Sequence, residues 1–187
     1  MHFREKFIFL KRFAKSPGRI GSVTPSSKFL TRAMLDRVNW DEANYIAELG
    51  AGTGVFTREI VKRAKDDSKI LVFEIDPDLQ KLIKEEHHTH KGLTLHSDAQ
   101  KLLTHMQEIG INKLDYVISS LPFTVLPRKM TVRILDAVIK ALKPEGHFIA
   151  YQYSSIMRHV LQKKFAKIKT RFVVFNIPPA FVYDCMN

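Results

Sequence analysis

The strongest chemical signal in this 187-residue chain is the run Glu48-Leu-Gly-Ala-Gly-Thr-Gly54. It places three glycines at alternate positions between an apolar segment and a segment with helical periodicity. Glycine lets the backbone turn tightly and approach a ligand closely, so such a turn is typical of nucleotide-cofactor sites. Twenty residues after Gly54 comes Glu74, where a carboxylate suits a bidentate hydrogen bond to ribose hydroxyls. The sequence therefore predicts a cofactor site that holds a ribose.

The spacing of the glycines separates this turn from the dinucleotide-binding turn. The pattern here is Gly-x-Gly-x-Gly, and an acid, Glu48, precedes it. Dinucleotide-binding turns carry Gly-x-Gly-x-x-Gly, in which the glycines admit a pyrophosphate. No glycine follows at that longer spacing, which argues against NAD and FAD.

A sheet must position the turn and the acid, and the chain shows strands that alternate with helices. Apolar segments predict strands at residues 44–49, 69–76, 93–97, 114–120 and 147–153, and an antiparallel pair at 171–176 and 180–185. Helical periodicity or capping residues predict helices at 3–15, 25–38, 55–65, after Asp76-Pro77, and at 130–142. A turn is expected at Pro144-Glu145-Gly146. The alternation predicts an α/β fold, a Rossmann-like doubly wound sheet of about seven strands with extra N-terminal helices.

Charge indicates the kind of partner. Lysine and arginine exceed the acids by 30 to 19, a net charge of +11. Residues 1–19 contribute +5 and residues 156–171 contribute +6, so these two segments account for the whole excess. Concentrated positive charge suggests a polyanionic surface, nucleic acid or anionic lipid, although general solubility also explains it. The lone cysteine, Cys185, has no partner for an internal disulfide.

Residues 3–14 have the pattern of a basic amphipathic helix. Phe3, Phe7, Leu10 and Phe13 fall on one face, and most basic residues fall on the other. Such a helix suits insertion at an anionic membrane surface, and the alternative is that its apolar face packs on the domain. The second basic segment, 163–171, fits either an edge strand protected by lysines or a contact with lipid phosphates or RNA. We expect no signal peptide and no membrane-spanning segment.

The glycine turn with its two acids resembles the class I S-adenosylmethionine-dependent methyltransferases. In that family the glycine turn lies against the methionine part of the cofactor, and the acid after the second strand holds the ribose. Asp98-Ala99 matches the position that binds the adenine amine, and Ser119 to Phe123 matches the motif beside the transferable methyl. The resemblance predicts that this chain binds S-adenosylmethionine with Glu48, Gly50, Ala51, Gly52, Gly54, Glu74, Ile75, Asp98, Ala99 and Ser119.

Two branches of the family share these motifs. In the ribosomal RNA adenine dimethyltransferases, the fourth motif is typically Asn-Leu/Ile-Pro-Phe/Tyr, whose amide binds the adenine amine and whose aromatic ring stacks on the base. This chain has Ser120 in place of that asparagine. It also stops before the extra helical domain of those enzymes.

The bacterial phospholipid N-methyltransferases are more similar. Their G-S/A-x-x-P-S-S, S-x-L-P and N-L-P-P-A segments are matched at residues 21–27, 119–122 and 176–180. The resemblance then covers nearly the whole chain. It divides the chain into an amphipathic helix and cofactor-covering loop, residues 1–24, and a methyltransferase domain, residues 25–187.

The expected function is N-methylation of phosphatidylethanolamine or a related amine phospholipid by a cytoplasmic enzyme bound peripherally to the inner face of the membrane. The alternatives are RNA adenine N6-methylation and methylation of a small soluble amine. No metal is expected. Catalysis is assigned to Ser120, Leu121, Pro122, Phe123 and Tyr153, and substrate binding to Ser26, Ser27 and Tyr183. A water chain, Tyr153 or Tyr183 is expected to accept the proton that the substrate amine loses.

Overall fold

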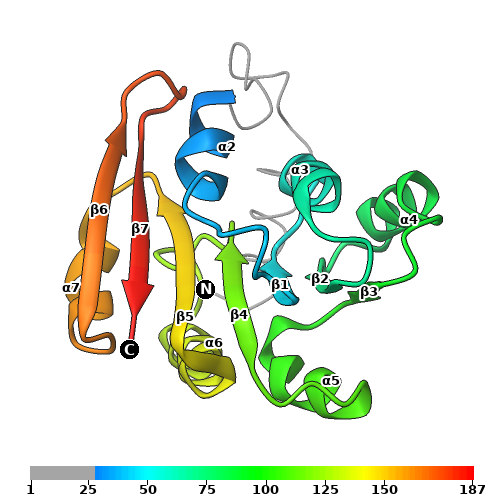
Figure 1. Cartoon of the computed structure of the whole chain (residues 1–187). Coiled ribbons are helices and arrows are strands. Elements are labelled where there is room, and N and C mark those ends of the chain that lie inside the picture. The colour runs from blue at the N-terminus through cyan, green and yellow to red at the C-terminus, as the bar shows by residue number, and fades with distance from the viewer. Residues whose placement is uncertain (1–27) are drawn as a thin grey trace.

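The computed structural model describes residues 28–187, which form one seven-stranded sheet in the order β3-β2-β1-β4-β5-β7-β6 (Figure 1). Strands β1 to β5 are parallel to one another, β7 is antiparallel to β5, and β6 is antiparallel to β7. The strands are β1 (Tyr45–Leu49), β2 (Lys69–Phe73), β3 (Leu93–His96), β4 (Leu114–Ser119), β5 (Leu142–Gln152), β6 (Lys167–Val173) and β7 (Ala180–Met186). The predicted α/β class and the antiparallel final pair are confirmed, but the first strand of that pair was predicted at 171–176 and instead spans Lys167–Val173, because residues 174–176 turn toward β7.

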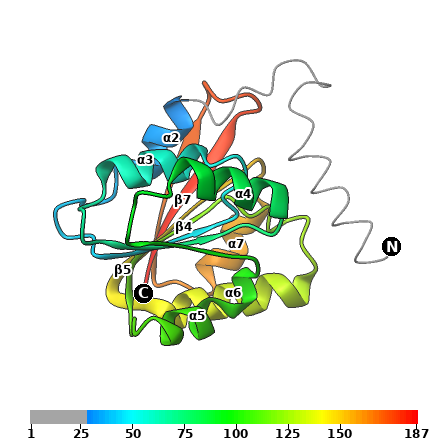
Figure 2. The same ribbon diagram turned by 90° about the vertical axis from the view of Figure 1, so that its right-hand side faces the viewer.

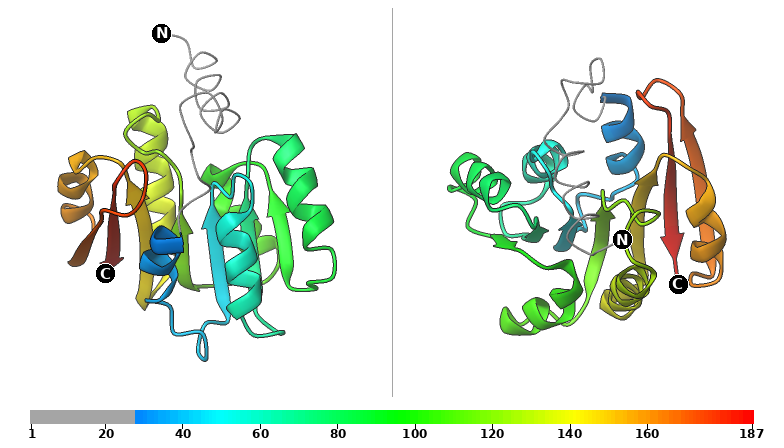
Figure 3. Two further views of the ribbon diagram at one scale, coloured as in Figure 1. Left: turned by 90° about the horizontal axis from the view of Figure 1, so that it is seen from above. Right: turned by 180° about the vertical axis from the view of Figure 1, so that it is seen from behind.

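Helices cover both faces of the sheet, as Figures 2 and 3 show from two sides and from above. On one face lie α2 (Lys28–Leu35), α3 (Val55–Arg63) and α4 (Pro77–Glu86). On the other lie α5 (Leu102–Glu108), which follows the short 3-10 helix η1 (Ala99–Lys101), then α6 (Arg128–Ala141) and α7 (Ile156–Gln162). The fold is therefore a three-layer α/β/α sandwich.

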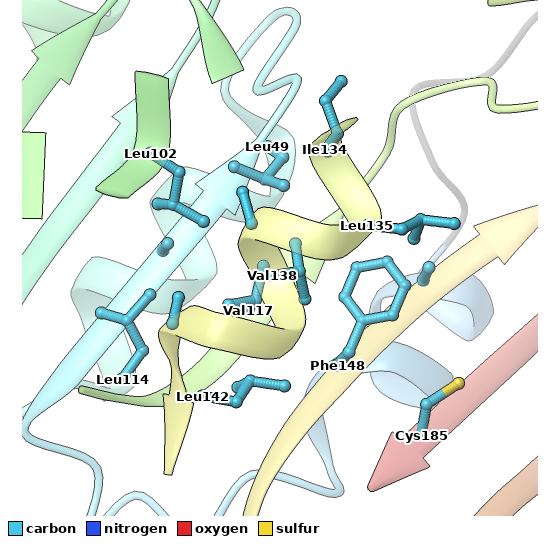
Figure 4. Packing of buried hydrophobic residues seen from close by; sticks show 14 of the residues in the cluster. Leu49, Leu102, Leu114, Val117, Ile134, Leu135, Val138, Leu142, Phe148 and Cys185 are labelled. Atoms are coloured by element: carbon cyan, nitrogen blue, oxygen red, sulfur yellow. The ribbon is translucent and has the colours of Figure 1, made fainter. Parts of the chain in front are cut away.

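The alternation of side chains along each strand builds two cores. Successive strand residues point to opposite faces, so Leu49, Val117 and Phe148 pack against α6 while their neighbours face α2 and α3 (Figure 4). The α6 side chains Ile134, Leu135 and Val138 fill the layer beneath the strands. Because both faces are covered, the central strands are apolar almost throughout, as expected of a parallel sheet.

Capping also follows the sequence. The side chain of Asp76 accepts a hydrogen bond from the amide of Asp78 at 3.0 Å, and Pro77 occupies the first turn of α4. An N-cap acceptor satisfies one of the helix amides that lack an intrahelical partner. The end of β2 is thus turned sharply into α4, which keeps Glu74 at the junction.

One local prediction was wrong. Residues 144–146 do not form a turn between α6 and the next strand, because β5 begins directly at Leu142 and runs through them. The register with β4 shifts between Leu114 and Tyr116, so the extra residues form a bulge. At Gly146 a Cβ would lie 2.9 Å from the Leu114 carbonyl oxygen, and only glycine fits there.

Two short helices were not predicted. The sequence reading predicted neither α5 nor α7, each of seven residues, because one turn of apolar periodicity is too little to separate a helix from a loop. The predicted helix 3–15, the domain boundary at residue 24 and the first residues of the predicted helix 25–38 lie outside the described residues. Within residues 28–187 no helix is long and apolar enough to cross a bilayer.

Candidate cofactor and active site

The glycine turn joins β1 to α3 at the carboxyl edge of the sheet. Gly50, Gly52 and Gly54 all have positive φ, at 81°, 59° and 77°. L-residues with a side chain avoid this region because Cβ collides with the backbone. The amides of Gly50 and Ala51 donate to the carbonyl oxygen of Phe73 at 2.8 and 3.1 Å, which ties the turn to the end of β2.

The turn is packed on one side and open on the other. A Cβ on Gly50 would lie 2.9 Å from Leu121 Cδ2, so the β1–α3 turn presses against the loop after β4. Among residues 28–187, a Cβ on Gly52 would meet no atom within 4 Å. The Gly52 backbone therefore faces space that a ligand can approach, which is the arrangement the predicted cofactor requires.

Glu74 is fixed by backbone amides. One carboxylate oxygen accepts a hydrogen bond from the Gly52 amide at 2.7 Å, and the other accepts from the Asp76 amide at 2.9 Å. Each carboxylate oxygen has a second lone-pair direction, so the group can also accept from hydroxyls. The structure thus couples the predicted ribose acid directly to the glycine turn, a link that the sequence spacing alone does not reveal.

Glu48 is fully buried beneath the turn. Its Oε2 accepts a hydrogen bond from the Thr57 hydroxyl at 2.7 Å, while Oε1 is buried and has no hydrogen-bond partner in the part of the chain that the structure describes. Burial raises the pKa of Glu48 to about 7, and the hydrogen bond from Thr57 only partly offsets this. A buried carboxylate with an unsatisfied oxygen favours a nearby cation. The sulfonium and ammonium groups of S-adenosylmethionine would supply positive charge at this end of the turn.

The pKa of Glu48 predicts a pH-dependent affinity. If the cationic cofactor favours the ionised carboxylate, raising the pH from 5.5 to 7.5 should tighten binding by up to about twentyfold, because the ionised fraction rises through a pKa near 7. The Glu48→Gln variant should bind more weakly and show a flat profile. Calorimetric titration with S-adenosylmethionine at several pH values measures both. Equal pH profiles for the two proteins would exclude this role for Glu48.

Hydrogen bonds from both the backbone and side chains hold the loop after β4 in place. The Ser120 amide donates to the Leu49 carbonyl oxygen at 2.9 Å, and the Leu121 amide donates to Ser119 Oγ at 3.2 Å. The Leu121 carbonyl oxygen accepts from Gln152 Nε2 at 2.8 Å. Ser119 is fully buried, so its hydroxyl shapes the loop rather than facing outward.

Ser120 differs from Ser119 in an important way. Its Oγ is buried and makes no hydrogen bond within the described part of the chain. An unpaired buried hydroxyl is costly, and such groups often mark positions that a ligand completes. Ser120 lies at the carboxyl end of β4, beside the glycine turn. In the methyltransferase families that this chain resembles, the substrate amine binds at this position.

The predicted adenine-side residues follow β2 and β3. Asp98 caps η1, its Oδ1 accepting a hydrogen bond from the Gln100 amide at 2.9 Å, and Ala99 begins η1. Ile75 has half of its side chain exposed next to Glu74. Since β1, β2 and β3 are parallel neighbours, their carboxyl ends bring these residues to the same edge as the glycine turn.

Two predicted site residues do not face that edge. The ring of Phe123 is 3% exposed and packs edge-on against Phe148 in the core, with ring centroids 6.2 Å apart. Tyr183 is fully buried in β7, and its hydroxyl lies 3.5 Å from the Ser154 carbonyl oxygen. Burial is the favoured state for both rings, and it removes the exposed face that stacking or substrate contact requires. Tyr153, by contrast, is partly exposed just after β5.

Two residues of the site were missed from the sequence. Thr57, which binds Glu48, lies among the core-facing positions of α3, and Gln152, which binds the Leu121 carbonyl, ends the apolar strand β5. A polar residue at an otherwise buried position was the available signal in both cases. Ser26 and Ser27 lie outside the described residues. From residue 28 onward no group of three or more metal-ligating side chains comes together.

Comparison with known proteins agrees with this geometry. Residues 25–173 match the family model described as ribosomal RNA adenine dimethylase. The chain is 30% identical over 184 residues to the ornithine lipid N-methyltransferase of Singulisphaera acidiphila, and the alignment covers 97% of this chain and 96% of that protein. It is 28% identical over 123 residues to the ribosomal RNA small subunit methyltransferase A of Mycoplasma capricolum, covering 60% of this chain and 42% of that relative.

Solved structures share the fold at low sequence identity. The precorrin-6y C5,15-methyltransferase of Geobacter metallireducens superposes with a TM-score of 0.65 at 14% identity, covering 87% of this chain and 93% of that one. SMU.1697c of Streptococcus mutans, solved in complex with SAH, gives a TM-score of 0.63 at 15% identity, covering 83% and 95%. The chain therefore belongs to the family that the ribosomal RNA adenine dimethylase model describes, and it is an S-adenosylmethionine-dependent N-methyltransferase.

Proposed function

We propose that this enzyme N-methylates an amine-bearing membrane lipid, phosphatidylethanolamine or a related lipid, at a membrane surface. The observation that carries the proposal is the similarity to the ornithine lipid N-methyltransferase, which extends over 97% of this chain and 96% of that relative. The chain spans under half the length of the ribosomal RNA methyltransferase relatives it matches. Similarity over the full length of a lipid enzyme supports a lipid amine as the acceptor.

The site geometry supports the same choice against an adenine base. Base stacking needs an exposed aromatic face, and the ring of Phe123 is packed in the core. Its backbone is also tied down, because its carbonyl oxygen accepts a hydrogen bond from the Thr131 hydroxyl at 3.2 Å. Ser120 offers one short hydroxyl, which suits a primary amine better than the broad edge of a base.

The chain's own residues mainly orient the reactants. S-adenosylmethionine supplies a methyl group on a sulfonium sulfur, which leaves as a neutral thioether. The hydrogen bond from Gln152 to the Leu121 carbonyl and the packing of Leu121 on Gly50 hold the loop that carries Ser120 beside the glycine turn. Ser120 Oγ then aligns the amine nitrogen for in-line attack, and such alignment supplies much of the rate enhancement. Tyr153, partly exposed after β5, or a water accepts the proton that the ammonium must lose.

The test is transfer of labelled methyl groups from S-adenosylmethionine to four acceptors. These are phosphatidylethanolamine vesicles, ornithine-lipid vesicles, RNA, and free ethanolamine. We expect label in the lipid fraction. The Ser120→Ala variant should lower kcat roughly tenfold to hundredfold through lost alignment while its affinity for S-adenosylmethionine stays unchanged.

A matched control is Thr104→Ala, which removes an exposed hydroxyl from α5 and should leave kcat unchanged. Label in RNA with none in lipid would replace the proposal by the adenine alternative. Label only in free ethanolamine would instead identify a soluble amine as the substrate. Full activity of Ser120→Ala on lipid would remove Ser120 from the mechanism.

A further inference from the structure

The most exposed large apolar side chains of the described residues lie after the carboxyl ends of strands or beside the loop between β6 and β7. Seven have more than half of their surface exposed, and the other exposed apolar residues reach at most 44%. The most exposed are Phe175 at 74% and Ile177 at 70%, both in the β6–β7 loop. The seven are Phe29, Ile75, Ile156, Phe172, Val174, Phe175 and Ile177. Scattered exposed apolar residues need no explanation, but a cluster of this kind does.

Four of these residues belong to one surface, which we call the hairpin patch: Phe29, Val174, Phe175 and Ile177. Phe172 is left out because its ring packs on Phe181, on the opposite face of the sheet from Val173 and α2. The rings of Phe29 and Phe175 lie 5.3 Å apart, so the start of α2 and the β6–β7 loop are in contact. Figure 1 shows the loop beside the upper end of α2. This contact joins Phe29 to the loop residues Val174 to Ile177, which follow it by more than 140 residues in sequence.

The hairpin patch is built on a packed base. Val173 and Ala180, the last residue pair of the β6–β7 ladder, are buried in the core. Between them Asn176 is almost fully buried, and its side-chain amide donates to the Pro178 carbonyl oxygen at 2.7 Å. The loop is thus shaped so that Phe175 and Ile177 point outward from either side of an inward-facing Asn176.

Topology places the hairpin patch at the edge that carries the active site. Because β7 is antiparallel to β5, it begins beside the carboxyl end of β5, where Gln152 pairs with Phe181. The glycine turn and the Ser120 loop follow β1 and β4 at that same edge. In Figure 1 the arrowheads of β4, β5 and β6 point to the end where the loop lies. A surface bound through the patch would therefore face the entrance of the site.

The surrounding charge is positive. Of the six lysines and arginines in residues 146–183, Lys163, Lys164 and Lys167 lie around the start of β6, at the end of the strand remote from the patch. Nearest to the patch are the exposed Arg171, three residues before Val174, and the exposed Lys28, next to Phe29. Aromatic and aliphatic side chains flanked by cations match a bilayer interface, where rings enter the acyl boundary and cations contact lipid phosphates.

We propose that the hairpin patch docks this enzyme on an anionic phospholipid bilayer and so presents the active site to lipid amines. The inference rests on the proposed function, because it names the surface through which a lipid-methylating enzyme reaches its substrate. Charge complementarity favours an anionic membrane over an apolar protein partner as the occupant.

Binding to vesicles tests the patch. The Phe175→Ser/Ile177→Ser variant of the full chain should bind vesicles of phosphatidylcholine with phosphatidylglycerol roughly tenfold more weakly, because two apolar side chains no longer enter the interface. The Leu82→Ser/Leu103→Ser variant removes two exposed leucines from α4 and α5 and should bind as the wild type does. Co-sedimentation at low and moderate salt measures both, with S-adenosylmethionine affinity as the check on folding.

A second measurement keeps the test decisive if the serine variant folds poorly. Phe175→Trp should show a blue-shifted emission and quenching by brominated acyl chains on vesicle binding, beyond the signal of the native Trp40, whereas Leu82→Trp should not. Unchanged vesicle binding of the serine variant, or an unquenched Trp at 175, would overturn the docking surface.

A second assay distinguishes failure of the proposed lipid substrate from failure of the docking surface. Methyl transfer to detergent-dispersed lipid needs no docking, so the serine variant should keep this activity while losing vesicle binding. If wild-type enzyme docked through the patch but methylated no lipid in detergent, the docking surface would stand and the lipid substrate would fall. If it methylated lipid while binding vesicles independently of the patch, the lipid substrate would stand and the docking surface would fall.

Discussion

Replacing Gly50 with alanine is expected to weaken S-adenosylmethionine binding by roughly hundredfold. Gly50 has φ of 81°, so a Cβ costs about 1–2 kcal/mol of backbone strain. That Cβ would also lie 2.9 Å from Leu121 Cδ2, so the Leu121 side chain must shift beside the Ser120 loop. The strain alone corresponds to roughly tenfold in affinity, and the displaced Leu121 side chain is expected to raise the loss to roughly hundredfold. Calorimetric titration of the purified variant measures the loss.

The chain contains a matched control for this strain. Gly110, in the turn after α5, has φ of 73°, and a Cβ there would meet nothing within 4 Å. Gly110→Ala therefore carries similar backbone strain without a collision at the site. It should lower the free energy of unfolding by about 1 kcal/mol and leave the affinity for S-adenosylmethionine unchanged. Equal affinities of the two variants would show that contact between the turn and Leu121 does not matter for binding.

The second large effect is expected at Glu74. Its carboxylate accepts from the Gly52 amide and the Asp76 amide, and glutamine would turn an NH₂ group toward one of these donors. Hydrogen bonds to charged groups contribute about 1.5–3 kcal/mol each, so losing one here and one to a ribose hydroxyl should weaken cofactor binding roughly hundredfold. The control is Glu85→Gln, since the carboxylate of Glu85 forms an exposed ion pair with Lys81 at 3.8 Å and its replacement should show no effect.

A double-substitution cycle separates ribose binding from support of the turn. Wild type and Glu74→Gln are each titrated with S-adenosylmethionine and with an analogue that lacks one ribose hydroxyl. If Glu74 binds that hydroxyl, its removal should weaken the wild type and leave the variant almost unchanged, so the effects are not additive. Additive losses would mean that Glu74 acts only by holding the Gly52 amide.

The core of the fold was predictable because its signals are local. Each parallel strand is a short apolar run, and helices α3, α4 and α6 each carry an apolar stripe or a cap, so these elements were predicted correctly, whereas η1 and α5 between them were missed. The bulge at residues 143–146 was not, because Pro144 and Gly146 also fit a turn. Only pairing with β4 shows that Gly146 fits against the Leu114 carbonyl within a continuous strand.

The sequence by itself determined the cofactor turn, since glycine spacing and the acid twenty residues later carry the chemistry wherever the sheet places them. The tertiary structure decided which polar groups complete the site. Thr57 reaches Glu48, and Gln152 reaches the Leu121 carbonyl across 31 residues, through contacts that no local pattern encodes.

Tertiary structure also decided which aromatic residues face solvent. Phe123 ends a motif and Tyr183 was predicted to bind the substrate, yet strand pairing and α6 packing bury both rings. Phe175 carries no motif of its own, yet the packed base of the β6–β7 hairpin leaves it exposed beside Phe29 at the active-site edge. The physical reason is that the residue type sets the free energy gained when a side chain is buried, whereas the packed fold decides how deeply the side chain at each position is buried.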